Sequence, residues 1–184
     1  KAMGAKARIY LAKTVPAGFA DRLKALGAEV VRSGDVYEES VAAAIADADR
    51  TGATLLADGT WPGYTDIPKW VMEGYCVIAE ELRAEFEASG RWPTHVYLQA
   101  GVGGLAAAMA HMIRLNWAEQ PELIVVEPEA AACLKASHLA GTPTRGEGPE
   151  SNMGRLDCKE PSIVAWQALE RCDVSYATLS EEEG

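Results

Sequence analysis

A glycine cluster at residues 101–104 is the segment of this sequence whose residue types and spacing most directly predict a binding chemistry. Residues 94–99 have the apolar content of a buried strand, and Gly101-Val102-Gly103-Gly104 comes almost directly after them. A helix rich in small residues is expected to begin immediately afterwards. Since glycine has no Cβ atom, several backbone N–H groups at the positive end of that helix can approach one oxyanion. The loop predicts a phosphate site, although the same glycines could serve packing alone.

Two common nucleotide-binding patterns do not fit this loop. A nucleotide P-loop would require Gly-Lys-Ser or Gly-Lys-Thr after the first glycines, and neither follows. The dinucleotide fingerprint would require a third glycine at a fixed offset, and that glycine is missing. The phosphate of a cofactor is therefore a better expectation than a nucleotide.

Two carboxylates follow segments that we predict as strands. Asp58 comes after residues 53–57, and Glu127 comes after residues 123–126. Ligand sites of open α/β sheets lie at such strand ends. Asp58 could belong to a ligand site or could merely begin an Asp-Gly turn. Glu127 could face a cofactor or could satisfy nearby backbone groups, and the residues alone leave both choices open.

Other reactive or aromatic side chains favour structural interpretations. Trp61 and Tyr64 could line a substrate pocket, but aromatic residues beside proline and glycine are more often packing residues. Cys158 has no histidine linked to it in the sequence, so a quiet buried thiol is expected. We interpret three neighbouring charged residues as surface charges: Asp157, Lys159 and Glu160.

Composition narrows the class of protein. With 17 basic and 27 acidic residues, the net charge of −10 argues against a nucleic-acid or anionic-membrane surface. No apolar run has the length of a membrane span, and no signal peptide is recognised. The scattered cysteines and histidines predict reduced thiols, a cytoplasmic location and no metal site.

The order of predicted elements indicates an α/β protein with parallel sheets and flanking helices. Strands alternate with helices at a spacing that suits right-handed crossovers. Strands are expected over residues 7–12, 28–31, 53–57, 94–99, 123–126 and 174–179. Helices are expected after Pro16, over 36–50, from a cap at Asp66, after Gly104, and over 130–140 and 161–171. We expect residues 1–60 to form part of a smaller lobe and residues 61–184 part of a larger, phosphate-binding lobe.

Four collinear segments resemble the diaminopropionate ammonia-lyases, which use pyridoxal 5′-phosphate (PLP) and have the tryptophan-synthase-β-like fold, fold type II. The first two are Asp58-Gly59-Thr60-Trp61-Pro62-Gly63-Tyr64 with Ile67-Pro68, and Gln99 to Gly104. The others are Val126-Glu127-Pro128 ahead of Ala132-Cys133, and the turn from Met153 to Ser162. The resemblance spans nearly the whole chain.

The resemblance implies a PLP-dependent lyase that eliminates ammonia from 2,3-diaminopropionate, a small amino acid, and yields pyruvate and ammonia. Gly101, Val102, Gly103, Gly104 and Glu127 would bind the cofactor. Asp58 matches the family's second catalytic aspartate and would transfer a proton or recognise the substrate's ammonium group. A serine or threonine dehydratase would use the same loop, but the Trp61–Tyr64 block favours the diaminopropionate enzymes. A non-catalytic fragment or binding module is the third alternative.

The resemblance also implies which parts are missing. The family's Schiff-base lysine lies upstream of the position that matches Lys1, and none of the seven lysines here matches it. Residues 1–4 resemble the tail of a preceding helix, and Ser180 to Glu183 resemble the capped first turn of another. We therefore expect a fragment that lacks activity alone and forms a homodimer or larger assembly.

Overall fold

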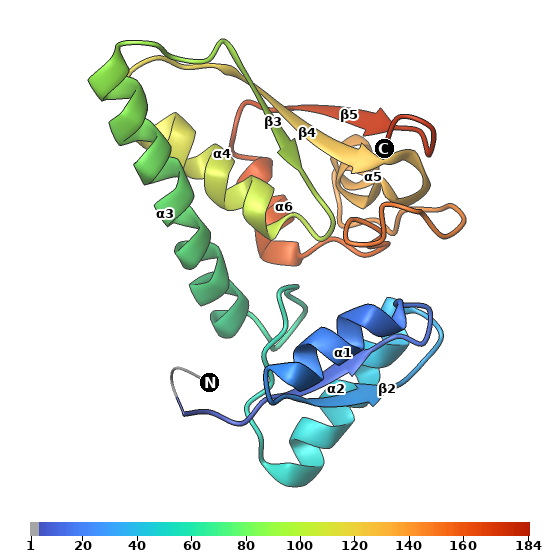
Figure 1. Cartoon of the computed structure of the whole chain (residues 1–184). Coiled ribbons are helices and arrows are strands. Elements are labelled where there is room, and N and C mark those ends of the chain that lie inside the picture. Colours follow the sequence, from blue (N-terminus) through green and yellow to red (C-terminus); the bar gives the residue numbers. More distant parts are fainter. Residues whose placement is uncertain (1–3) are drawn as a thin grey trace. The chain divides into compact units, whose positions relative to one another are not determined.

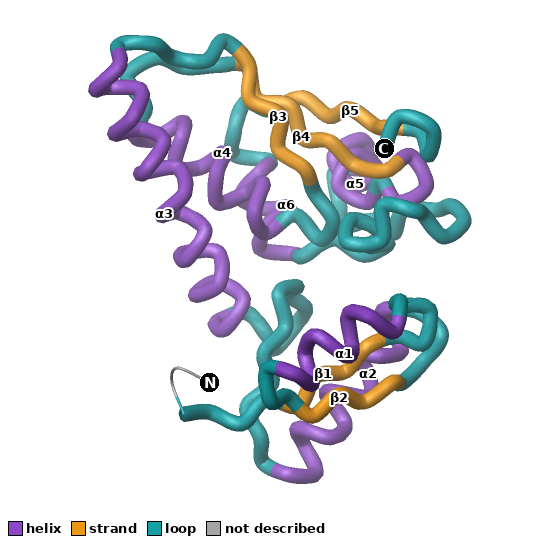
Figure 2. The backbone as a smooth tube through the Cα atoms, in the orientation of Figure 1, coloured by secondary structure: helices purple, strands orange, loops and turns teal. Residues whose placement is uncertain are grey.

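A computed structural model describes residues 4–184, and these form two compact units. One unit ends at Leu56, and the other runs from Ala57 to Gly184. Both contain parallel strands that alternate with helices along the chain, so the predicted α/β class is confirmed (Figures 1 and 2). The expected helix tail at residues 1–4 lies almost entirely outside the described residues.

The first unit is a small βαβα arrangement. Strands β1 (Arg8–Leu11) and β2 (Glu29–Arg32) pair in parallel, with Ile9 opposite Val30. Helix α1 (Ala17–Ala25) connects them and packs on β2, while α2 (Tyr37–Thr51) packs on β1. Gly52 adopts the left-handed conformation that ends α2, with a φ of 72°.

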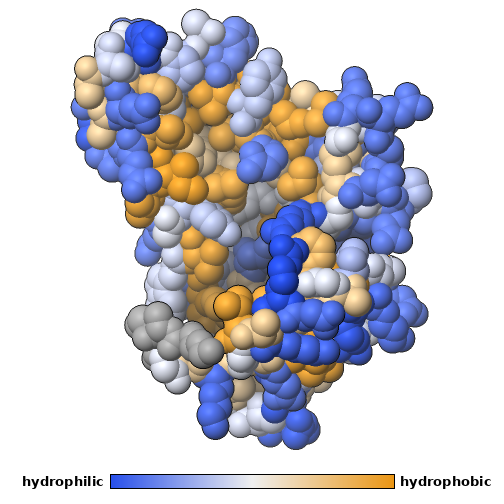
Figure 3. Space-filling view, in the orientation of Figure 1, coloured by the Kyte–Doolittle hydropathy of each residue, from blue (hydrophilic) through white to orange (hydrophobic). Residues whose placement is uncertain are grey.

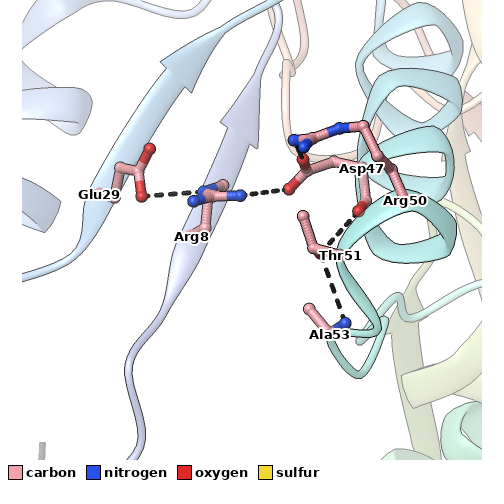
Figure 4. Close-up of polar contacts among 6 residues, drawn as sticks. All are labelled: Arg8, Glu29, Asp47, Arg50, Thr51 and Ala53. Atoms are coloured by element: carbon pink, nitrogen blue, oxygen red, sulfur yellow. Dashed lines mark hydrogen bonds and ion pairs between the residues drawn. The ribbon is translucent and has the colours of Figure 1, made fainter.

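Charged side chains join the two strands and α2 of this unit. Arg8 donates from Nε to Glu29 Oε2 at 2.8 Å and from Nη1 to Asp47 Oδ2 at 2.5 Å (Figure 4). Arg50 donates to the other oxygen of Asp47. The hydrogen bond from Arg8 is the main cause of a lowered pKa at Asp47. Because the cluster spans all three elements, we interpret it as structural.

The predicted strand over residues 53–57 is absent. This segment pairs with no strand among residues 4–184, and Leu56 is 73% exposed. Its backbone is instead held by side chains. Ala53 N–H donates to Thr51 Oγ1 at 3.4 Å, and Ala57 N–H donates to Tyr64 Oη at 2.9 Å. An apolar run without a neighbouring strand cannot complete a ladder, which explains the wrong prediction.

The second unit is built on a three-stranded parallel sheet in the order β3-β4-β5. Its strands are β3 (His95–Gln99), β4 (Glu122–Pro128) and β5 (Ser175–Leu179). Five helical elements accompany them in chain order: α3 (Asp66–Ser89), α4 (Gly104–Asn116), the short 3₁₀ helix η1 (Glu129–Ala131), α5 (Cys133–Ala140) and α6 (Ile163–Leu169).

Alanine lets the helices of this unit approach one another closely. Helix α4 packs against both α3 and α6, and its Ala106, Ala107 and Ala110 are fully buried. Their small side chains leave room for backbone-to-backbone approach. Trp117, just after α4, donates from Nε1 to the Ala79 carbonyl on α3 at 3.1 Å. These contacts form a closely packed core around α4, the helix that follows the glycine loop.

Several helix boundaries differ from those predicted. Thr65, not Asp66, precedes α3, and Asp66 is the first helical residue. The helix expected over 130–140 is divided at Ala132, whose ψ of 62° interrupts it between η1 and α5. At the other end, Glu183 Oε2 accepts hydrogen bonds from the N–H and Oγ of Ser180, both at 2.9 Å. This closes a single turn at residues 181–183.

Candidate functional site

The glycine loop connects β3 to α4 at the carboxyl edge of the sheet. Gly103 has a φ of +99°, a conformation that residues with side chains rarely adopt. A Cβ atom there would lie 2.9 Å from Leu134 Cδ1 and 3.3 Å from Ala165 Cβ. Position 103 therefore requires glycine for its backbone conformation and for the close approach of α5 and α6.

Gly101 is restricted by a different neighbour. A Cβ atom on Gly101 would lie 3.0 Å from Cys158 Sγ and 3.2 Å from the Arg155 carbonyl oxygen. The turn that contains Cys158 therefore packs directly on the loop. Gly104 has more room, since its nearest neighbour would be Met72 Cγ at 3.6 Å.

The start of α4 offers backbone donors to an anion. The first N–H groups of a helix have no acceptor within the helix, and the N-cap residue of this one, Gly103, has no side chain that could cap it. Its 13 residues also give the N-terminus a partial positive charge. Glycines at 101, 103 and 104 leave no Cβ atoms around these donors. The geometry fits the phosphate group of a cofactor such as PLP.

Asp58 lies in the same unit as the loop. Its carbonyl oxygen would be 3.9 Å from a Cβ atom built on Gly104, and a Cβ atom on Gly59 would be 3.8 Å from Val102 Cγ1. The Asp58 side chain is exposed. The structure thus brings together the predicted aspartate segment and the predicted phosphate loop, although Asp58 does not follow a strand.

Two buried hydroxyl groups that we did not predict hold this arrangement together. Thr60 N–H donates to Ser162 Oγ at 3.1 Å, and the two hydroxyl oxygens lie 2.8 Å apart. Ser162 N–H in turn donates to the Val102 carbonyl at 2.9 Å. The available signal was the preference of serine for the position before a helix, here α6. Nothing in the sequence indicated the pairing with Thr60.

Glu127 caps a second helix. Its side chain is 1% exposed, and its two oxygens accept the N–H groups of Leu134 and Lys135, both at 2.8 Å, at the start of α5. Burial raises the pKa of this carboxyl to about 7, and the two backbone hydrogen bonds oppose that shift. The carboxylate satisfies nearby backbone groups, and its contact with a cofactor remains a prediction.

Trp61 and Tyr64 close the turn that follows Asp58. Their rings stack with centroids 4.4 Å apart, and their backbones exchange two hydrogen bonds. Tyr64 Oη also accepts the Ala57 N–H. These contacts give both side chains a packing role, and a role in lining a substrate pocket remains untested.

The interpretation of Asp157 and Lys159 as surface charges was wrong. Lys159 is only 13% exposed, and its Nζ donates to the carbonyls of Ala130 and Pro149 at 2.6 and 2.8 Å and to Asp157 at 2.5 Å. With three acceptors its ammonium group is fully engaged. Glu160 does lie at the surface, where it pairs with Arg145.

Other kinds of site find no support in the described part of the chain. Residues 4–184 contain no group of three or more side chains placed to hold a metal ion. The cysteines at positions 76, 133, 158 and 172 form no disulfide within the same residues. Within the same residues, the helices are too short or too polar to span a membrane.

The sequence matches a family of PLP enzymes and resembles ammonia-lyases and dehydratases. The pattern of the family described as pyridoxal-phosphate dependent enzyme matches residues 1–184. Diaminopropionate ammonia-lyase of Escherichia coli strain K12 is 31% identical over 181 residues, which are 97% of this chain and 46% of the relative. Biosynthetic L-threonine dehydratase of Corynebacterium glutamicum is 31% identical over 187 residues, which are 100% of this chain and 39% of the relative.

A solved structure agrees with this similarity. The crystal structure of Escherichia coli diaminopropionate ammonia-lyase in complex with an aminoacrylate–PLP azomethine reaction intermediate superimposes with a TM-score of 0.86 at 31% identity. The match covers 96% of this chain and 45% of that one. The chain thus spans about half the length of the curated diaminopropionate ammonia-lyase that it matches. Because the family pattern covers the whole sequence and the fold agrees, the chain belongs to the pyridoxal-phosphate-dependent enzymes, as its motifs predicted.

Proposed function

We propose that this chain is part of an ammonia-lyase that acts on 2,3-diaminopropionate. The observation that carries the proposal is the start of α4, whose N-cap is the obligatory glycine at 103, next to the segment that bears Asp58. The N–H groups of residues 103–106 would hold the cofactor phosphate. When bound, PLP supplies an electron sink for the negative charge that develops at the substrate's α-carbon.

Asp58 is the proposed acid or base of this chain. Its carboxyl group would hold the ammonium of the substrate's β-amino group, or would give it a proton as ammonia leaves. The exposed side chain and the packing of its backbone against α4 support this role. Glu127 would contact the cofactor, as the family resemblance implies, and it also fixes the start of α5, whose Leu134 packs on Gly103.

A serine or threonine dehydratase is the second candidate. It is favoured by the 31% identity to a threonine dehydratase over the full chain. The Trp61-Pro62-Gly63-Tyr64 block, which we associate with the diaminopropionate enzymes, favours the first candidate.

Product stoichiometry separates the two reactions. The full-length protein should be given 2,3-diaminopropionate, serine and threonine in separate assays, with the keto acid and ammonia both measured. Elimination from 2,3-diaminopropionate releases two ammonia molecules for each pyruvate, whereas dehydration of serine or threonine releases one for each keto acid. Turnover of serine and threonine without turnover of 2,3-diaminopropionate would refute the first candidate.

The 184-residue chain alone should be inactive. None of its lysines matches the family's Schiff-base position, and amine catalysis through PLP requires one. Steady release of pyruvate by the purified chain would contradict this, and would also remove the third candidate, a non-catalytic fragment or binding module.

We also propose that the chain self-associates and acts in the cytoplasm. Trp70, Val77 and Ile78 are 64%, 56% and 42% exposed on α3, and Figure 3 shows apolar side chains along part of that helix. Tyr97, on a strand of a parallel sheet, is 66% exposed, although such sheets are normally covered on both faces. Apolar surface of this kind favours association. A single monomeric species by light scattering across micromolar concentrations would refute the assembly.

A further inference from the structure

Thr60 and Ser162 form a buried hydroxyl pair that joins two distant segments. They lie 102 residues apart in the sequence, and their exposed fractions are 4% and 1%. Ser162 Oγ accepts the Thr60 N–H at 3.1 Å, while Thr60 Oγ1 accepts the Val164 N–H at 2.8 Å. Since the two oxygens lie 2.8 Å apart, one hydroxyl donates to the other. Because both residues are buried, removal of one hydroxyl group would leave the other without that partner, which is costly in a buried site.

The pair is connected to both parts of the candidate site. Ser162 N–H donates to the carbonyl of Val102, inside the glycine loop, at 2.9 Å. Thr60 lies two residues after Asp58, and its carbonyl accepts the Ile163 N–H at 3.3 Å. The hydrogen bonds therefore run from the loop through Ser162 and Thr60 to the segment that carries Asp58.

Capping of α6 explains only part of this arrangement. A cap requires the contact between Thr60 Oγ1 and Val164 N–H, since this satisfies one donor of the first turn. It does not require the Thr60 N–H to donate to Ser162, nor Ser162 to hold Val102. These two contacts fix the position of the Asp58 segment against the loop.

We propose that Thr60 and Ser162 are positioning residues that set the Asp58 carboxyl group relative to the phosphate site. This inference rests on the proposed function, in which the loop binds the cofactor and Asp58 serves the reaction. Displacement of an acid or base by about 1 Å can cost roughly 100-fold in rate. The pair should therefore govern turnover more than retention of the cofactor.

The variants for the test are Thr60→Val, Ser162→Ala and Thr60→Ser in the full-length protein. The first two remove one hydroxyl each, and the third keeps it. Ser137→Ala is the matched control. Ser137 is equally buried, and its Oγ donates to the Cys133 carbonyl at 2.6 Å and accepts the Thr144 N–H at 2.8 Å, so neither bond involves a group of the Asp58 segment or of the glycine loop. Ser137→Ala therefore removes a buried hydroxyl group and leaves the Thr60–Ser162 pair intact.

Hydrogen–deuterium exchange gives a readout that does not depend on activity. Thr60→Val and Ser162→Ala should speed exchange in residues 58–60 and in residues 101–104 together, whereas Ser137→Ala should speed it only near residues 137–144. Faster exchange confined to residues 162–164 would show a helix cap and nothing more, and would overturn the inference. Ser162→Ala, the smaller perturbation, decides the result if Thr60→Val does not fold.

Kinetics complete the test. Thr60→Val and Ser162→Ala should keep the cofactor absorbance but lower kcat by about 10- to 100-fold. Thr60→Ser should have nearly the kcat of the unmodified protein, and Ser137→Ala should not change kcat. In an Asp58→Asn background, Thr60→Val should slow turnover little further, because its target is already gone. If the two substitutions lowered kcat independently, so that their effects multiplied, the coupling of Thr60 to Asp58 would be refuted but the proposed function would not. A full-length protein without PLP absorbance would refute the proposed function itself.

Discussion

Two helices of the second unit begin at neighbouring strand ends, and their N-termini are completed in opposite ways. Helix α4 follows β3 through a loop that contains Gly101 and Gly103, and its N-cap residue, Gly103, has no side chain that could cap it. Helix α5 follows β4, and the buried carboxylate of Glu127 accepts two of its first N–H groups. Helix α5 is thus capped by a carboxylate of the chain itself, whereas the first N–H groups of α4 are left for a ligand.

The surroundings strengthen this difference. A Cβ atom on Gly146 would lie 3.0 Å from the backbone nitrogen of Cys133, so a loop covers the start of α5. Lys159 fastens that loop through the carbonyls of Ala130 and Pro149. At α4, Leu134 lies against Gly103, and the turn that contains Cys158 lies against Gly101. A glycine loop and an internal carboxylate are thus two solutions to the same unsatisfied donors, and only the first can take a ligand.

The largest expected effect comes from placing an anion inside the open site. Gly103→Asp in the full-length protein should abolish cofactor absorbance and activity. The side chain would be strained at a φ of +99°, would meet Leu134 Cδ1 at 2.9 Å, and would add a negative charge where the phosphate binds. Absorbance spectroscopy and gel filtration of the purified variant measure the result.

Gly18→Asp is the control for this change. Gly18 lies in α1 with ordinary φ, and a Cβ atom there would meet nothing within 4 Å. This variant should keep both the cofactor and activity. Retention of cofactor absorbance by Gly103→Asp would refute the phosphate-site assignment.

A smaller but still large effect is expected at Asp58. Asp58→Asn should retain the cofactor, because the open N–H groups of α4 are untouched, and should slow turnover by about 100-fold or more. Cofactor absorbance and kcat are measured on the same preparation. Loss of the cofactor together with activity would show that Asp58 supports the loop and does not serve proton transfer.

Local patterns were sufficient to predict the strand, the glycine loop and the helix of the candidate site, because these three parts are consecutive in the sequence. The same reasoning was wrong for residues 53–57, since a strand depends on a partner that the segment itself does not encode. The pairing of Thr60 with Ser162 could not be predicted either, because it joins segments 102 residues apart. Glu127 was recognised at a strand end, but only the position of α5 shows what its oxygens accept.

The buried Glu127 carboxyl group, which caps the start of α5, should make the free energy of unfolding depend on pH. The pKa of Glu127 is raised from 4.5 to about 7, so between these values the folded protein binds more protons than the unfolded chain. The group's contribution to the unfolding free energy should therefore be largest below pH 4.5 and fall as pH rises to 7, by about 3 kcal/mol at most.

Urea unfolding of the 184-residue chain and of Glu127→Gln across pH 4.5–8 tests this. The amide does not titrate, so the pH slope due to this group should disappear. Glutamine also offers one acceptor where the carboxylate offers two, so one N–H of α5 loses its partner and stability at neutral pH should fall by about 1–2 kcal/mol. Parallel pH profiles for the two proteins would contradict the origin of the slope.

The smallest expected effect is weak phosphate binding, which should distinguish the start of α4 from the start of α5 most directly. Exposed backbone N–H groups at a helix N-terminus contribute roughly 1 kcal/mol or less each, so the 184-residue chain should bind free phosphate only weakly. In a phosphate titration followed by NMR, the amide signals of Gly103, Gly104 and Leu105 should shift, and Gly103→Asp should abolish the shifts. The amides of Leu134 and Lys135 should stay unchanged, because the Glu127 carboxylate already occupies them and would repel a second anion. Shifts at α5 equal to those at α4 would show that both helix starts are open to an anion, and the distinction between a loop that binds a ligand and a helix that carries its own cap would then be wrong.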